Sequence, residues 1–314
     1  MTTNTAGGTL NIAIGNYAMD ALTSGDSNVA VGPSSQGSLT TGSANVSMGE
    51  DSLFTNTTGG KNTAIGHDTL RLSTTGSENV ALGAFALQAN TTGSTNVALG
   101  DEALNANTTS ANSVAVGSQA LKANTGAANI AIGRKAATAN TSGVRNIAIG
   151  FEAYDASDTE NDNIAIGYQA MTTNTAGGTL NVAVGNYSLD ALTSGDNNTA
   201  TGHYALGALT TASNNTAFGF SALRVNTGAS NTAVGANSLY ANTGAENSAL
   251  GMYALYNNTT GGQNTAVGES ALIANTTASN NVAVGKSALE ANTTGASNVA
   301  VGALALDANT TASF

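Results

Sequence analysis

Histidines and carboxylates are the side chains in this sequence that could bind a metal ion or move a proton. The chain of 314 residues has two histidines, His67 and His203, together with 19 Asp and Glu residues and no cysteine. A metal or catalytic site needs several such groups that converge, and no Ser/His/Asp or Cys/His arrangement can be assembled. We therefore expect no enzyme activity, no cofactor and no metal site, with both histidines at exposed corners.

Several carboxylates follow a recurrent glycine, where carboxylates of neighbouring repeats could hold Ca²⁺. The Gly-Gly-x-Gly-x-Asp repeat of calcium-binding β-rolls is absent, however, which favours solvated charges. Between residues 154 and 162 the sequence diverges from the repeat, and its carboxylates there predict an exposed acidic turn. The residues are Glu50, Asp51, Asp68, Asp101, Glu102, Glu152 and Glu269 after the glycine, and Asp155, Asp158, Glu160 and Asp162 in the turn.

Aromatic side chains recur one or two residues after the same glycine. Such spacing predicts a stripe along one corner of a repeating structure. The stripe has two interpretations, a surface that binds glycans or packing that covers the ends of the core. Its members are Tyr17, Phe85, Phe151, Tyr168, Tyr187, Tyr204, Phe220 and Tyr253.

These residues are positioned by a tandem repeat that runs through the whole chain. The repeat begins with Asn-x-Ala-x-Gly, and 13 of its 17 steps are 17 residues long. We call each repeat a coil and count positions from this anchor residue as zero. Residues 1–314 are thus predicted to be a single repeat array without a separate globular domain. The anchors are at 11, 28, 45, 62, 79, 96, 113, 129, 146, 163, 181, 198, 215, 231, 247, 264, 281 and 298.

The anchor segment predicts a short strand with two different faces. Positions +1 and +3 carry Val, Ile, Leu or Thr, and positions +2 and +4 carry Ala and Gly, on opposite faces of a strand. Because neither face is polar, we expect both to be buried, with the branched face in the core of its own coil. The Ala/Gly face would then pack against the opposite wall of the coil or against a neighbouring chain. Ala-Leu at +7 and +8 favours a second short strand over a helical turn.

The steps of 16 and 18 residues arise in the Asn-Thr-Thr-Gly segment, which marks this segment as the loop side. The same segment provides formal N-glycosylation sites at Asn56, Asn90, Asn107, Asn258, Asn275, Asn292 and Asn309. Stacked coils would align the loop asparagines into a partial ladder of amides.

A more complete ladder is expected at the anchors, where the asparagines are Asn11, Asn28, Asn45, Asn62, Asn79, Asn96, Asn129, Asn146, Asn163, Asn181, Asn198, Asn215, Asn231, Asn247, Asn264, Asn281 and Asn298. The anchor asparagines would lie above one another in the stack, and each side-chain amide could bond the amides of the neighbouring coils. The pattern predicts an all-β fold, a parallel β-solenoid or β-roll of about 18 coils with a 17-residue period.

The pattern Asn-x-Ala-Ile/Val-Gly-x-x-Ala/Ser resembles the head repeat of trimeric autotransporter adhesins, a left-handed parallel β-roll. The fuller unit, as in residues 79–94, resembles repeats of phage and viral tail-fibre proteins. The resemblance covers residues 11–314 and implies a homotrimeric fibre on a virion or a cell surface. The near-regular period and the Asn-Thr-Thr-Gly loops depart from the adhesin pattern.

Composition limits the partners of such a fibre. Net charge is −11 with only eight Lys and Arg, all scattered, which disfavours nucleic acids and anionic membrane surfaces. No apolar run is long enough to span a membrane. We expect an extracellular structural shaft whose first partner is itself, as a lateral trimer with possible end-to-end stacking. The alternative function is a cell-surface adhesin head that binds host glycans or matrix through the aromatic corner.

Overall fold

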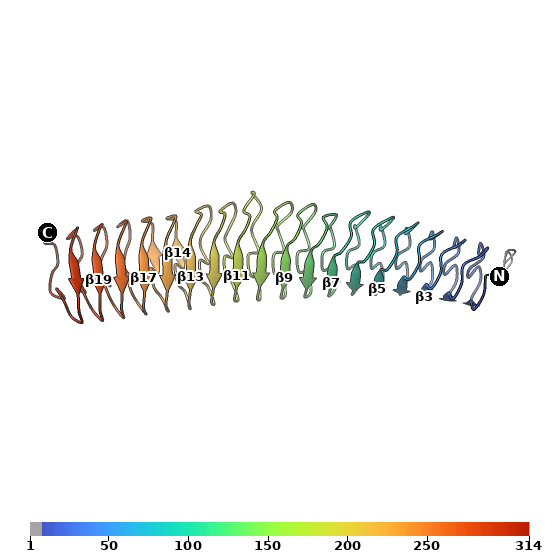
Figure 1. Cartoon of the computed structure of the whole chain (residues 1–314), viewed down its shortest axis with the longest axis horizontal. Coiled ribbons are helices and arrows are strands. Elements are labelled where there is room, and N and C mark those ends of the chain that lie inside the picture. Colours follow the sequence, from blue (N-terminus) through green and yellow to red (C-terminus); the bar gives the residue numbers. More distant parts are fainter. Residues whose placement is uncertain (1–7, 314) are drawn as a thin grey trace. The chain divides into compact units, whose positions relative to one another are not determined.

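The computed structural model describes residues 8–313 as an all-β parallel solenoid (Figure 1). The chain divides into two compact units, Met1–Asn161 and Asp162–Phe314, and both consist of the same coil. Residues 1–7, which repeat the sequence of residues 171–177, lie outside the described residues, as does Phe314. The described residues contain no helix, and none of them forms a segment that could cross a membrane as a helix.

Unit 1 contains one three-residue strand in each coil, immediately after the anchor residue. The strands pair in parallel and in register, so that Val80, Ala81 and Leu82 lie beside Val97, Ala98 and Leu99. The strands are β1 (Ile12–Ile14), β2 (Val29–Val31), β3 (Val46–Met48), β4 (Thr63–Ile65), β5 (Val80–Leu82), β6 (Val97–Leu99), β7 (Val114–Val116), β8 (Ile130–Ile132) and β9 (Ile147–Ile149).

Unit 2 repeats this arrangement and adds two short strands on the loop side. These are β14 (Val225–Asn226) and β16 (Ala241–Asn242), which pair in parallel with each other. The other strands are β10 (Ile164–Ile166), β11 (Val182–Val184), β12 (Thr199–Thr201), β13 (Thr216–Phe218), β15 (Thr232–Val234), β17 (Ser248–Leu250), β18 (Thr265–Val267), β19 (Val282–Val284) and β20 (Val299–Val301).

The two strand faces are arranged opposite to the sequence expectation. Ala81 is fully buried, whereas the flanking Val80 and Leu82 are 38% and 47% exposed. The coil is too thin to hold branched side chains from both walls, so alanine faces inward and the large Leu or Met comes from position +8. Of the two partners expected for the Ala face, the opposite wall of the coil is confirmed. The prediction that branched side chains fill their own coil was wrong.

Glycine at +4 is required for both of the reasons that the sequence left open. Gly133 has φ +133°, in the region that disfavours other residues. A Cβ there would also lie 2.4 Å from the carbonyl oxygen of Gly150 in the next coil. The glycine column therefore turns the corner and lets adjacent coils approach closely.

The expected second strand at +7 and +8 was wrong, because these positions form a turn. The Ala86 N–H donates to the Gly83 carbonyl at 3.3 Å, and the Asn90 N–H donates to the Leu87 carbonyl at 3.1 Å. Phe85 and Leu87 have φ of 57° and 51°, the left-handed region. Both of their N–H groups bond to carbonyls of neighbouring coils. Stacking thus stabilises a turn that an isolated coil would not adopt.

The anchor asparagines form the predicted ladder. The N–H of Asn96 donates to Oδ1 of Asn79 at 3.0 Å, and Asn79 Nδ2 donates to the carbonyl of Gly93 in its own coil at 2.9 Å. Ser113 interrupts the amides but still donates its N–H to Asn96 Oδ1 at 3.0 Å. An anchor asparagine such as Asn79 therefore bonds a neighbouring coil and also closes the loop of its own coil.

Candidate functional site

The aromatic residues predicted as one stripe lie at the expected corner but do not form a continuous surface. In unit 1, Tyr17 is 72% exposed. Phe85 makes an edge contact with His67, and the guanidinium of Arg134 lies over the ring of Phe151. The predicted rings of unit 1, Tyr17, Phe85 and Phe151, belong to coils that lie several repeats apart in the sequence.

Unit 2 brings four stripe residues together with one histidine. We define the aromatic patch as Tyr168, Tyr187, His203, Tyr204 and Phe220, which come from four successive coils. Tyr187 and Tyr204 stack with centroids 5.0 Å apart and planes at 12°, and His203 stacks on Phe220 at 5.7 Å and 7°. Edge contacts join the two stacks, since the His203 and Tyr204 centroids are 4.2 Å apart.

The backbone fixes these rings in place. The Tyr187 N–H donates to the carbonyl of Tyr168 at 3.0 Å, and the Asn237 N–H donates to the carbonyl of Phe220 at 2.9 Å. Burial among the neighbouring rings, followed by the nearby Tyr168, raises the pKa of the Tyr187 phenol above its ordinary value.

Sequence reasoning missed several members of these clusters. Arg224 places its guanidinium 4.3 Å from the centroid of Tyr204, and His203 was expected only as an isolated corner residue. Tyr240 and Tyr256, at position +9, stack at 5.3 Å, and Tyr256 also contacts the predicted Tyr253. Position +9 of one coil lies near position +6 of its neighbour, a proximity that a scan of the +5 and +6 columns alone does not detect.

The second surface feature is the outer face of the sheet. We define the lateral face as the side chains at positions +1 and +3, which point away from the coil. In unit 1 its 18 positions contain one polar residue, Thr63, and no charge. Side chains along it remain substantially exposed, with Met48 at 51% and Ile132 at 40%. In unit 2 six of the 18 positions are Thr or Ser, so the apolar character is concentrated in unit 1.

Several carboxylates near the corner form ion pairs between coils. Lys122 Nζ lies 2.7 Å from Glu102 Oε2, and Arg71 Nε lies 3.6 Å from Asp51 Oδ2. The hydrogen bond from Lys122 holds the pKa of Glu102 below its usual value. Within residues 8–313 no three His, Asp or Glu side chains are grouped as a metal site would require.

The acidic segment after residue 154 differs from the exposed turn that was predicted. Glu160 is buried, and its Oε2 accepts hydrogen bonds from the N–H groups of Asp158 and Thr159, both at 3.1 Å. Burial raises the pKa of Asp155. The coil carries Tyr154 in place of the usual leucine and Ser157 in place of the loop asparagine, so a bulkier core residue accompanies the altered loop.

The loop asparagines are confirmed as a partial ladder. Asn275 Nδ2 donates to Asn258 Oδ1 at 2.7 Å and to the Ala278 carbonyl at 3.0 Å. Six of the seven formal glycosylation sites are fully buried, namely Asn56, Asn90, Asn107, Asn258, Asn275 and Asn292. Their amide nitrogens point into the coil, which makes an attached glycan incompatible with the folded array.

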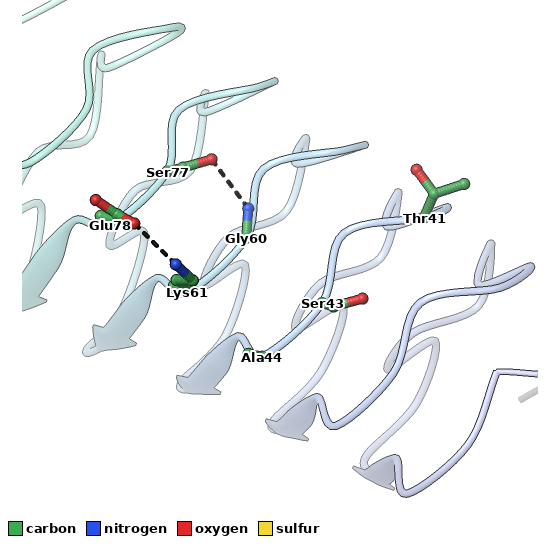
Figure 2. Close-up of a pocket in the computed structure, with 7 residues that line it drawn as sticks. All are labelled: Thr41, Ser43, Ala44, Gly60, Lys61, Ser77 and Glu78. Atoms are coloured by element: carbon green, nitrogen blue, oxygen red, sulfur yellow. Dashed lines mark hydrogen bonds and ion pairs between the residues drawn. The ribbon is translucent and has the colours of Figure 1, made fainter.

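A groove of about 440 Å³ lies on the surface of unit 1 where Gly60 lacks a side chain (Figure 2). Lys61 Nζ forms an exposed pair with Glu78 at 3.0 Å beside it, and the Gly60 N–H donates to Ser77 Oγ at 3.1 Å. Lys61 and Glu78, the two charged residues along the groove, are thus already paired with each other, and its shallow wall holds no convergent set of groups.

No known family model matches this chain, and no curated protein sequence is similar to it at a significant level. The resemblance to fibre repeats therefore rests on the repeated motif alone.

Proposed function

We propose that this chain is a structural segment of an extracellular fibre, which associates side by side with further copies through the lateral face. The observation that supports the proposal most strongly is the uncharged outer face of unit 1. Exposed apolar patches of more than a few hundred Å² on soluble proteins mark interaction sites. Nine strands about 4.8 Å apart and about 10 Å long give roughly 400 Å² on unit 1 alone.

Self-association fits this face better than a globular partner does. Every coil presents its side chains at +1 and +3 in the same register, and in unit 1 nearly all of them are apolar, as for Ile130 and Ile132 beside Ile147 and Ile149. A second copy carries an identical periodic row, so that symmetric packing repeats one contact along the whole face. Three chains around a common axis, the assembly implied by the resemblance, would remove this face from water in every copy.

The route to this oligomer differs from the one the sequence suggested. The Ala face was a candidate for contact between chains, but Ala148 is fully buried within its own coil. The outward Ile147 and Ile149 on either side of it take that role in our proposal. A larger residue at position 148 would overpack the coil itself and would report on folding.

A charge-insertion pair of variants tests the proposal. Val80→Lys with Leu82→Lys places two charges on the lateral face, where both side chains are already partly exposed in the single chain. Thr92→Lys with Thr109→Lys adds the same charges on the exposed loop side. We expect the first variant to dissociate to a 30.7 kDa chain and the control to keep the native mass, because unpaired charges are costly inside an interface.

Light scattering of the purified proteins measures the outcome. A native protein that is monomeric at all concentrations, or a lateral-face variant that retains the native mass, would contradict the proposal. Circular dichroism of each variant confirms that the coil is intact.

The second candidate function is adhesion through exposed corner residues. The aromatic patch of unit 2 favours it, because its rings lie at positions +5 and +6, outside the lateral face, and stack on one another across successive coils.

A further inference from the structure

We infer that Phe220 and its surroundings form a binding platform for neutral oligosaccharides. This inference gives the adhesive candidate function a location and a ligand class, and it does not depend on lateral assembly. It rests on three features of the aromatic patch: an open ring face, flanking polar groups and a rigid backbone.

The open ring face belongs to Phe220, the last ring of its stack. His203 covers one side of the ring at 5.7 Å, yet Phe220 remains 53% exposed. In the next coil the same position is Ala236, which is too small to cover the other side. Phe220 therefore keeps one face of its ring uncovered as an apolar surface.

The central rings of the patch, Tyr187 and Tyr204, are unsuitable as binding platforms. They support the rings beside them. Tyr204 has Tyr187 stacked at 5.0 Å from the preceding coil and Arg224 at 4.3 Å from the following coil. Both faces of Tyr204 are therefore occupied. The arrangement holds His203 in place through its 4.2 Å contact with Tyr204, and His203 in turn supports Phe220.

Polar groups lie beside the open ring. Asn237 follows Ala236 and donates its N–H to the Phe220 carbonyl, and its partly exposed side-chain amide has no hydrogen bond within residues 8–313. An amide offers both donors and an acceptor to sugar hydroxyls. An apolar ring face with a few adjacent polar groups is the usual composition of a small-ligand site.

Charge and rigidity select the ligand class. Net charge of −11 repels anionic ligands at long range, which favours neutral sugars over sulfated or sialylated ones. Backbone hydrogen bonds at Tyr187, Ser221 and Asn237 fix the ring-bearing corners. Ligand binding therefore orders little of the protein, and the affinity lost to ordering is small.

The test uses the full chain and titration calorimetry with cellohexaose, chitohexaose and maltohexaose, with heparin as the anionic comparison. We expect at least one neutral hexasaccharide to bind, and Phe220→Ala to weaken that binding about tenfold, the loss for one aromatic contact. Phe220→Trp should retain binding. Phe85→Ala, which removes a corner aromatic outside the patch, is the matched control and should change nothing.

Absence of binding by all three neutral sugars at millimolar concentration would overturn the inference, as would preferential binding of heparin. Equal losses in Phe220→Ala and Phe85→Ala, or no loss in Phe220→Ala, would also overturn it. Light scattering on the same samples separates the two proposals. A monomer that binds sugar would contradict only the proposed lateral assembly. An oligomer that binds no sugar would contradict only the proposed sugar site.

Discussion

A buried polar pair in unit 1 gives a sharp test of how the core tolerates exceptions. Position +8 holds Gln36 where most coils have leucine, and position +2 of the next coil holds Ser47 where every other coil has alanine. Both are fully buried. Gln36 Nε2 donates to Ser47 Oγ at 2.8 Å and to the Val29 carbonyl at 2.9 Å, whereas Gln36 Oε1 has no partner in the described chain.

The two single substitutions should differ from the double one. Ser47→Ala removes an acceptor of the buried Gln36 amide and the hydrogen-bond partner of the buried Ser35 hydroxyl, and should destabilise the protein by about 1–3 kcal/mol. Gln36→Leu removes the unpaired Oε1 together with two hydrogen bonds, so these effects partly cancel and the expected change is within about 1 kcal/mol.

The double variant has leucine at +8 and alanine at +2 of the following coil, the same combination that Leu53 and Ala64 provide one coil later. In that coil the neighbouring Ser52 Oγ donates to the Ala64 carbonyl at 3.0 Å, and Ser35 could make the same bond in the double variant. With the unpaired oxygen gone and leucine in its place, we expect the double variant to exceed the native protein in stability by about 1–3 kcal/mol.

Urea denaturation of the four proteins measures these free energies, and amide exchange in β2 and β3 shows where they act. Repeat arrays can unfold in more than one step, so the exchange data decide in case the urea curves are not two-state. A double variant less stable than the native protein would contradict this prediction, because it would show that the polar pair stabilises the coil.

Three further predictions concern the glycine column, the left-handed corner and an ion pair. Gly133→Ala should cost at least about 3 kcal/mol from strain and backbone clash, whereas Gly207→Ala, which lacks a positive φ and whose nearest contact is 3.2 Å, should cost far less in thermal melts. Thr95→Asn should raise Tm, with a gain of about 0.5–1 kcal/mol, because exposed Thr95 has φ 59° and asparagine tolerates that region better; an unchanged or lower Tm would count against it. Lys122→Met should make Tm fall less as the pH is lowered. The lowered pKa of Glu102 stabilises the folded chain at pH values above the unfolded pKa of glutamate, and this contribution is lost as the pH falls through the folded pKa of Glu102. Identical Tm-versus-pH profiles for Lys122→Met and the native protein would show this third prediction to be wrong.

The sequence predicted the repeat, the parallel strands and the asparagine ladders, because each follows from residues that must occupy equivalent places in successive coils. The loop side was located by the steps of 16 and 18 residues, and the hydrogen bonds of Asn275 agree with that assignment. A periodic constraint of this kind is visible without any three-dimensional information.

The direction of the strand faces could not be predicted from polarity, because both faces are apolar. Which one faces inward depends on the thickness of the coil, and the leucine column at +8 already fills the space that Val80 and Leu82 would need. The turn at +6 to +8 was missed because residues such as Phe85 and Leu87 rarely adopt positive φ. Their conformation is imposed by hydrogen bonds between coils.

The aromatic patch was only partly predictable. The column positions of Tyr187 and Tyr204 were evident, but the contribution of Arg224 from position +9 depends on the offset between neighbouring coils. Side-chain neighbours across coils are set by this offset, which the one-dimensional period does not contain.

The most direct test of lateral assembly is the mass of the native particle in solution, measured by light scattering over a range of concentrations. Burial of the uncharged face of unit 1 in every copy predicts a stable mass of three chains of 30.7 kDa. A stable, soluble particle with the mass of one chain would contradict lateral assembly, because the exposed Val80, Leu82 and Ile132 would then have no partner.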